Sequence, residues 1–266
     1  MPHIKRVFLC VFFVLSLIRL SAGDDFCGIS NFSFGNGEVI TFKVFYNVIG
    51  LYVDAGTASF TISNSKLNGR PAYHVVGLGT SNPSYDWIFK VRDRYETYID
   101  TSTLKPLKFV RHVEEGGFRK DELVTFDHAN RKATSTKGTY AINECMQDVL
   151  SSIYYARNID FSKYKIGDKI NFSMFLDDEV HNIYIRYMGK ETIKTRYGKF
   201  RAIKFKPMLI KGTIFEGGEL MTVWVSDDGN HVPLRIESPI TVGSVKVDMM
   251  GYRNLRYPLR SMISFK

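Results

Sequence analysis

The chain has 266 residues, of which 44% are apolar, 14% aromatic and 24% charged, a composition that excludes intrinsic disorder and low-complexity sequence. Its 15 Tyr and 20 Phe are typical of pleated structure, and a mainly β chain of this length can form one domain. Basic residues exceed acidic ones by nine, but they are spread along the predicted strands, so we expect no nucleic-acid partner.

Residues 1–22 have the features of a secretory signal peptide. Lys5 and Arg6 precede an apolar run over 7–18, and small residues at 21–23 lie before an acidic pair. The run is short for a membrane span, and an uncleaved anchor is the alternative. We expect the segment to be removed on export to the periplasm or cell envelope. Residues 23–266 then form a single domain.

Removal of that segment would leave two cysteines, Cys27 and Cys145. In an oxidising compartment the two thiols can pair. Such a bridge would close a loop of more than a hundred residues and stabilise the chain by about 4–5 kcal/mol on the chain-entropy estimate. Free, buried thiols are the alternative that the sequence leaves open.

From residue 38 onward, apolar and polar residues alternate with period two, the pattern of strands with one buried face. The longest run is Trp87–Ile99, where Trp87, Phe89 and Val91 share the apolar side. Short turns rich in Gly, Asn and Asp separate the runs. The predicted strands cover 39–46, 56–62, 72–77, 87–99, 107–113, 122–126, 169–175, 182–187, 201–206, 220–225, 234–237 and 244–249.

One segment, 143–158, has helical periodicity instead. Its apolar stripe comprises Met146, Val149, Leu150, Ile153 and Tyr154, with Asn143 as a plausible N-cap and Asn158 as a terminator. A sheet of about a dozen strands must curl. We therefore predict a mainly β fold, a strongly curved antiparallel sheet or half-barrel with one principal α-helix packed on it.

Catalytic motifs are weak. Three S-x-x-K matches, at 63–66, 102–105 and 162–165, lie in turns or polar connections and are best explained by chance. Two acidic turns, Asp177-Asp178 with His181 and Asp227-Asp228 with His231, could supply metal ligands if they met in space. Turn stabilisation by Asp explains them equally well. We expect no catalytic residue, no bound metal and no cofactor.

Asp93 falls in register with Val91 and Tyr95, on the apolar side of its predicted strand. A buried carboxylate needs a partner, and Arg157 at the end of the predicted helix is a candidate. We predict that Asp93 and Arg157 form a buried polar clamp between helix and sheet. A functional acid with a raised pKa is the alternative.

Several segments, taken in order and spacing, resemble the DUF3108 family of uncharacterised exported bacterial proteins. They are Glu38 with Phe42–Tyr46, Trp87–Tyr95, Leu104–Leu107, Glu114–Gly117, Gln147–Arg157, Gly198–Phe200 with Pro207, Val223–Asp228, Pro233–Glu237 and Gly243-Ser244. The resemblance implies a fold similar to the LolA/LolB carriers, an incomplete antiparallel barrel with an apolar concave face lidded by helices. It implies no catalytic residues.

Export, the curling sheet and the methionine and aromatic content favour a non-catalytic binding module for a lipid, acyl chain or lipoprotein segment. We assign the apolar ligand surface to Trp87, Phe89, Val91, Met208, Met221 and Trp224 on the concave face. An envelope assembly factor that binds another protein is the second hypothesis. A metal-dependent hydrolase that uses the two acidic turns is the third.

Overall fold

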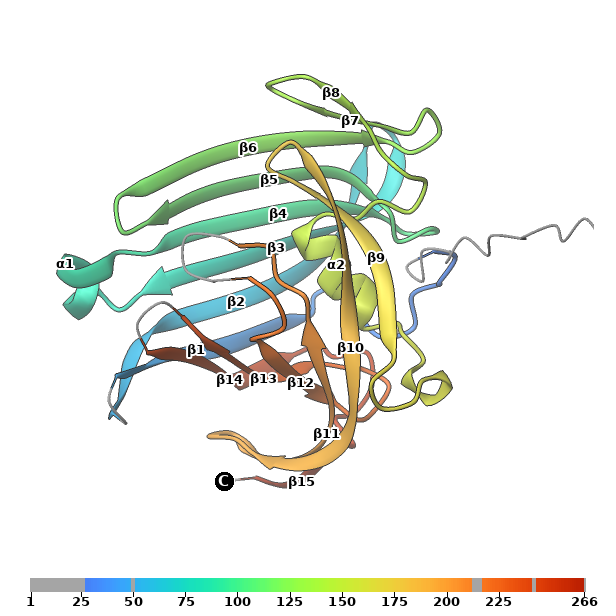
Figure 1. Ribbon diagram of the computed structural model, residues 1–266. Helices are drawn as coiled ribbons and strands as arrows, with labels where there is room; N and C mark the ends of the chain where they lie inside the picture. Colours follow the sequence, from blue (N-terminus) through green and yellow to red (C-terminus); the bar gives the residue numbers. More distant parts are fainter. Residues whose placement is uncertain (1–26, 49–50, 212–216, 241–242, 266) are drawn as a thin grey trace, which may run out of the picture.

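The computed structural model describes residues 27–48, 51–211, 217–240 and 243–265 (Figure 1). The predicted signal peptide, residues 1–22, lies outside the described residues. Within these ranges the chain forms one antiparallel sheet with two short α-helices and two 3₁₀ turns. The predicted fold class, a mainly β protein with a curved antiparallel sheet and one principal helix, is confirmed.

The strands share antiparallel pairing with their neighbours. They are β1 (Val39–Val48), β2 (Leu51–Leu67), β3 (Arg70–Ser81), β4 (Arg92–Asp100), β5 (Pro106–Glu115), β6 (Phe118–Asp127), β7 (Lys132–Ser135), β8 (Thr139–Ala141), β9 (Lys169–Leu176), β10 (Glu179–Lys194), β11 (Gly198–Pro207), β12 (Thr222–Ser226), β13 (Pro233–Pro239), β14 (Ser244–Arg253) and β15 (Met262–Phe265). The helical elements are η1 (Pro83–Tyr85), α1 (Asp86–Phe89), α2 (Val149–Ala156) and η2 (Phe161–Lys163).

The sheet begins and ends at β8 and β9, and the two halves of the chain meet in its middle. The order is β8-β7-β6-β5-β4-β3-β2-β1-β14-β13-β12-β11-β10-β9, and β15 pairs with β11. Pairing of β1 with β14 therefore joins the first half to the second. Figure 1 shows the sheet curling so that β9 and β10 face β4 and β5 across α2.

The gap between the two edges is spanned by the segment before α2. The Gln147 backbone N–H donates to the Ser173 carbonyl at 2.9 Å, and the Phe175 N–H donates to the Gln147 carbonyl at 2.8 Å. Phe175 also packs against Phe126 of β6 and Tyr140 of β8. Edge strand β9 is therefore covered, and the curved sheet is close to a barrel.

Helix α2 is shorter than the stripe over 143–158 predicted. Its N-cap is Asp148, not Asn143: the Asp148 side chain accepts from Ser151 N–H while the Ser151 hydroxyl accepts from Asp148 N–H. This capping box fixes the start of the helix. The preceding residues are not helical: residues 144–145 form a turn, Gln147 pairs with β9, and Cys145 is bonded to Cys27.

Three apolar clusters form the core. The largest surrounds α2 and includes Tyr154 and Tyr155 of the helix with inward side chains of β9–β12. A second includes Phe42, Phe200, Trp224 and Met249, and a third joins β5, β6 and β9 through Phe109, Phe126 and Phe175. The helix therefore lies inside the curve of the sheet, against both β4 and β9.

Candidate functional site

The inner face of β3 can be identified from its glycines. A Cβ on Gly77 would meet the Phe60 ring and the Leu150 side chain of α2, so this face points into the sheet. Gly79 is on the same face, and a Cβ there would meet only the Asp93 Cβ at 3.7 Å. Beyond the helix, towards the β3–β4 turn, a Cβ added to Gly79 would therefore meet no atom of α2 within 4 Å.

A group of apolar residues beside the central core is only partly buried. Met208, Ile210, Met221 and Ile236 pack against the central core, yet each stays partly exposed. Met208 extends β11, since its N–H donates to the Tyr184 carbonyl of β10 at 2.8 Å. On α2, the side chains of Val149, Ile153 and Ala156 are likewise packed against the core but only half-buried. We call Met208, Ile210, Met221, Ile236, Val149 and Ile153 the apolar wall.

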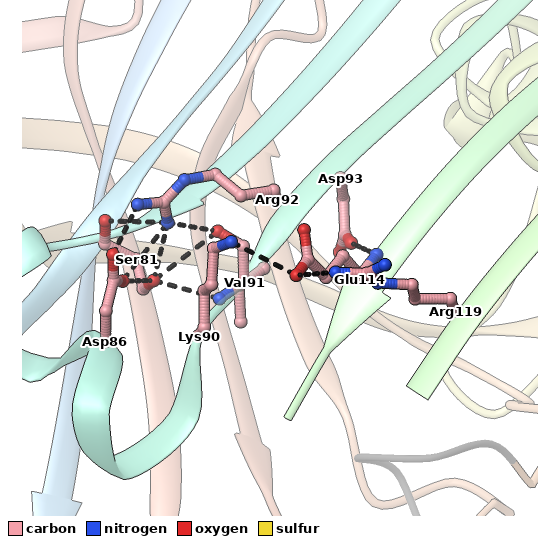
Figure 2. Close-up of polar contacts among 8 residues, drawn as sticks. All are labelled: Ser81, Asp86, Lys90, Val91, Arg92, Asp93, Glu114 and Arg119. Carbon is pink, nitrogen blue, oxygen red and sulfur yellow. Dashed lines mark hydrogen bonds and ion pairs between the residues drawn. The ribbon is translucent and has the colours of Figure 1, made fainter. Parts of the chain in front are cut away.

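The inner face of β4–β6 carries polar side chains, which we call the polar wall. Asp93 is half-buried, and its carboxylate accepts from the Glu114 N–H at 3.2 Å (Figure 2). Burial, followed by the nearby Glu115 carboxylate, raises the pKa of Asp93 to about 7. Tyr95, next on this face, has its pKa raised to about 12, mainly by burial. Near neutral pH this wall therefore includes a carboxyl group that is partly protonated.

Arg111 completes the polar wall. Its Nε lies 2.7 Å from Glu122 Oε2, and its guanidinium also pairs with Asp177 in the β9–β10 turn. Lys120 pairs with the same Asp177 carboxylate, whose pKa is lowered by these two cations against the effect of burial. Buried charges require such partners. The Arg111 network holds the β9–β10 turn against β5 and β6.

The predicted ligand residues are only partly brought together. Met208 and Met221 belong to the apolar wall, and Val91 lies half-buried just before β4. Trp87 and Phe89 do not belong to the apolar wall, because they are in α1, and Trp87 is 83% exposed. The turn sequence explains the error, because Asn82 caps η1 by accepting from Ser84 N–H and Pro83 occupies its first turn, which ends β3.

Trp224 is also misassigned. It faces away from its inward neighbours Val223 and Val225 and is buried in the second cluster, where its Nε1–H donates to Glu191 at 2.6 Å. Adjacent residues on a strand point to opposite faces. The sequence pattern over 220–225 predicts a strand with Trp224 on one face and Val223 and Val225 on the other, but it does not indicate which face lies inside.

The predicted Asp93–Arg157 clamp is wrong. Arg157 instead forms a buried ion pair with Glu38, at 2.5 Å from Nη1 to Oε1 and 2.9 Å from Nη2 to Oε2. Its Nε–H also donates to the Asn230 carbonyl at 3.1 Å. Arg157 is at the far end of α2, whereas Asp93 lies near the β3–β4 turn. A clamp does exist, but its carboxylate is supplied by the residue just before β1.

The two acidic turns do not meet. Asp177 pairs with Arg111 and Lys120, and Asp178 pairs with Lys137 at 2.9 Å. Asp227 pairs instead with Lys190 at 2.7 Å. His231, in the same turn as Asp227, instead has its Nδ1 2.7 Å from the Arg157 carbonyl. In the described ranges no three His, Cys, Asp or Glu side chains are placed to hold a metal ion.

Two cavities lie away from the apolar wall. The larger, about 470 Å³, is bordered by Arg70, Lys105, His128 and Arg131 near the β4–β5 turn. The smaller, about 260 Å³, lies between the β10–β11 turn and β13–β14, beside Arg196 and Lys246. Both are lined largely by charged side chains and share no residue with the apolar wall.

Cys27 and Cys145 form a disulfide, with 5.4 Å between their Cα atoms. It ties the chain before β1 to the segment that spans the sheet edges. Structural disulfides persist in oxidising compartments, so the bond indicates an extracytoplasmic location. As for membrane spans, α2 and the other helices of the described ranges are all too short or too polar to cross a bilayer.

Comparison with known proteins gives a family and a fold. A family model described as "Protein of unknown function (DUF3108)" matches residues 41–250. No curated protein matches the chain. A β-barrel-like protein of the DUF1849 domain from Brucella abortus is similar in structure, with a TM-score of 0.55 and 10% identity, covering 87% of this chain and 100% of its own.

Two further structures are more distant. A candidate lipoprotein from Parabacteroides distasonis has a TM-score of 0.38 and 15% identity, over 85% of this chain and 99% of that one. An exported protein with a YmcC-like fold from Bacteroides fragilis has a TM-score of 0.36 and 12% identity, over 85% and 100%. The Brucella structure supports the barrel-like fold, and none of the three supplies a site.

Proposed function

The chain belongs to the DUF3108 family, whose function is unknown. We therefore propose a function from the geometry of the chain itself. The chain is a non-catalytic binding module of the periplasm or cell envelope. Its ligand is an amphiphile, a lipid or the acyl chain of a lipoprotein, held on the inner face of the sheet. The observation that carries the proposal is the apolar wall, which packs on the core yet remains partly exposed.

The apolar wall would supply affinity by burying hydrocarbon. Each buried methylene is worth roughly 0.8 kcal/mol, so a chain of several carbons that covers Met208, Met221 and Ile153 gives useful binding. Methionine suits this role because its thioether side chain adapts to ligands of different shape. Gly79, on the inner face of β3, has no side chain that would compete with such a chain.

The polar wall would set the orientation of the ligand. Asp93 can donate a hydrogen bond when protonated and accept one when ionised, and its pKa of about 7 allows both near neutral pH. Arg111 is already neutralised by Glu122 and Asp177. The wall therefore favours a hydroxyl, amide or ester over a second strong anion.

The methyl ester of cis-parinaric acid, a fluorescent acyl chain with an uncharged head, tests the proposal by titration. We expect saturable binding, and a Met221→Glu variant should bind at least tenfold more weakly because it places a charge on the apolar wall. Met208→Trp, which fills the space without a charge, should weaken binding as well.

Leu220→Glu is the matched control: this residue adjoins Met221 but is 45% exposed. Its affinity should equal that of the wild type, and circular dichroism should show all variants folded. Absence of binding to the wild type, or equal loss in Met221→Glu and Leu220→Glu, would count against the inner face as the ligand site.

A protein-binding role is the second candidate, and edge strand β8 is the feature that favours it. Among the described strands, Thr139–Ala141 pairs on one side only, with β7. A partner could add a strand there. At three residues the edge offers few hydrogen bonds, which is why we place this role second. Retention of a stoichiometric envelope protein that is lost on Tyr140→Pro would support it.

A further inference from the structure

The turn between β3 and β4 carries an exposed apolar tip. We use this name for Trp87, Ile88 and Phe89 of α1, whose exposed fractions are 83%, 62% and 44%. Figure 1 shows α1 beyond the end of the β3–β4 hairpin, apart from the rest of the sheet. Three consecutive large apolar residues on one exposed turn exceed the scattered exposure normal for a surface.

The apolar tip is held in place by a polar network at its base (Figure 2). The Asp86 carboxylate accepts from the Ser81 hydroxyl and from Arg92, whose Nη2 lies 2.5 Å from Asp86 Oδ2. Ser81 Oγ in turn accepts from the Val91 N–H at 2.9 Å. These bonds join the two ends of the turn, so the tip is presented on a fixed base.

The exposed rings carry little unsatisfied polarity. The Trp87 Nε1–H, the only polar group of the indole, donates to the Ser84 carbonyl at 3.1 Å. Phe89 lies against Gly116 of the β5–β6 turn, where an added Cβ would be 2.2 Å from the ring. The apolar tip can therefore enter an apolar medium without breaking a hydrogen bond of its own.

Cations surround the base of the tip. Lys90 and Arg119 share the single Glu114 carboxylate, each at 3.1 Å, while Arg92 is matched by Asp86 (Figure 2). Lys90 and Arg119 thus share one carboxylate beside the tip, while Asp93, with Glu115 close to it, lies toward the inner face. An apolar tip backed by basic residues is the pattern of interfacial anchors, which insert into the bilayer while cations contact anionic head groups.

We propose that the apolar tip docks the protein on the surface of an anionic phospholipid bilayer, with Trp87, Ile88 and Phe89 inserted and Lys90 and Arg119 at the head groups. A stable protein interface buries about 800 Å² on each partner, more than three side chains on a narrow turn provide. Insertion of a few side chains into a bilayer suffices for reversible binding. This docking is independent of the ligand on the apolar wall.

Vesicles of equal parts phosphatidylglycerol and phosphatidylcholine test the proposal by co-sedimentation. We expect binding that weakens as salt is raised, because exposed charges are screened. Trp87→Ser with Ile88→Ser should lower the partition at least tenfold. Ile263→Ser with Phe265→Ser, which removes exposed apolar residues of β15, is the control and should leave it unchanged.

Fluorescence locates the inserted ring. Vesicles with brominated acyl chains should quench the emission that is lost in Trp87→Phe, a variant that silences the probe yet keeps an aromatic ring.

Equal sedimentation of wild type and Trp87→Ser/Ile88→Ser, or no quenching of Trp87, would overturn the proposal. So would a tip-dependent envelope protein in place of vesicle binding. Binding of the parinaric ester by the tip variant should stay at the wild-type level, which separates failure of membrane docking from failure of the proposed ligand site.

Discussion

Arg157 joins parts of the chain that are distant in sequence. Its guanidinium pairs with both oxygens of Glu38 and lies over the rings of Phe34 and Tyr154, at 5.5 and 5.2 Å from their centroids. The backbone carbonyl oxygen of Arg157 lies 2.7 Å from Nδ1 of His231, and the pKa of this histidine is lowered chiefly by burial. Because Arg157 ends α2 and Glu38 precedes β1, this pair holds the helix inside the sheet.

Replacement of Glu38 by Gln should lower the free energy of unfolding by about 3–5 kcal/mol, since the buried guanidinium loses its countercharge. Urea denaturation followed by circular dichroism measures the change. Asp121→Asn is the control, because Asp121 pairs with His112 in an ion pair whose carboxylate is 83% exposed. Equal midpoints for the two variants would show that the Glu38 pair contributes no more than a surface contact.

The sequence predicted that a charge on this helix would be clamped, but it could not identify the partner. Period-two alternation placed Asp93 on the inner face correctly, and the half-buried Asp93 does lie there. Which carboxylate reaches Arg157 depends on how far along α2 each strand crosses. That distance follows from the curvature of the whole sheet and from no local pattern.

At the scale of elements, α2 depends on a buried cap. Asp148 is fully buried, and its carboxylate accepts from the Ser151 N–H at 2.8 Å and the Thr97 hydroxyl at 2.6 Å. Burial raises the pKa of Asp148 to about 7, against the opposing effect of these hydrogen bonds. The cap therefore joins helix α2 to β4 through a carboxyl group that titrates near neutral pH.

The raised pKa of Asp148 predicts a pH dependence of stability. In the unfolded chain the carboxyl has a pKa near 3.9, so between about pH 4 and pH 7 the folded state holds a proton that the unfolded state releases. Stability from this group is complete below pH 4 and is lost as pH rises through 7. The free energy of unfolding of Asp148→Asn should therefore rise relative to that of the wild type by up to about 1.4 kcal/mol per pH unit over this window.

Urea denaturation of both proteins from pH 5 to pH 8 measures this difference. Asp160→Asn is the matched control, because Asp160 caps η2 through Ser162 in the same way but is exposed, and its pKa is lowered. The control should show no trend above pH 5. A constant difference between Asp148→Asn and the wild type across this range would contradict a raised pKa.

Elements were predicted from sequence with unequal success. Alternation predicted most strands, because a half-buried strand requires it, but it missed the short strands β7, β8 and β15. Alternation also predicted a strand that begins too early, within α1, because Trp87, Phe89 and Val91 happen to be apolar at every second position of a turn. Asn82-Pro83 was the available signal, since a capping Asn followed by Pro starts a helical turn.

At the scale of the whole molecule, the two ends of the curved sheet differ. The disulfide, the Arg157–Glu38 pair and the rings around α2 close the end that holds the chain before β1. Asp93 of the polar wall and the apolar tip lie at the other end, beside the β3–β4 turn. Docking and ligand entry would therefore occur on one side of the protein.

Composition and charge indicated the compartment and the fold, but they did not show which part of the inner face helix α2 covers. Strand alternation indicates which residues share a face, whereas helix α2 decides how much of that face is covered. The small residues Gly77 and Gly79 were visible in the sequence, and only the packing of Leu150 against Gly77 distinguishes a position covered by α2 from one that is not.

Native mass spectrometry of the protein, purified from its own envelope in mild detergent, tests the central claim most directly. We predict a population heavier than the polypeptide by the mass of one lipid or acyl chain, released on denaturation and absent from Met221→Glu but present in Leu220→Glu. A wild-type protein that carries no added mass, or that carries the same lipid when Met221 is replaced by Glu, would contradict the account.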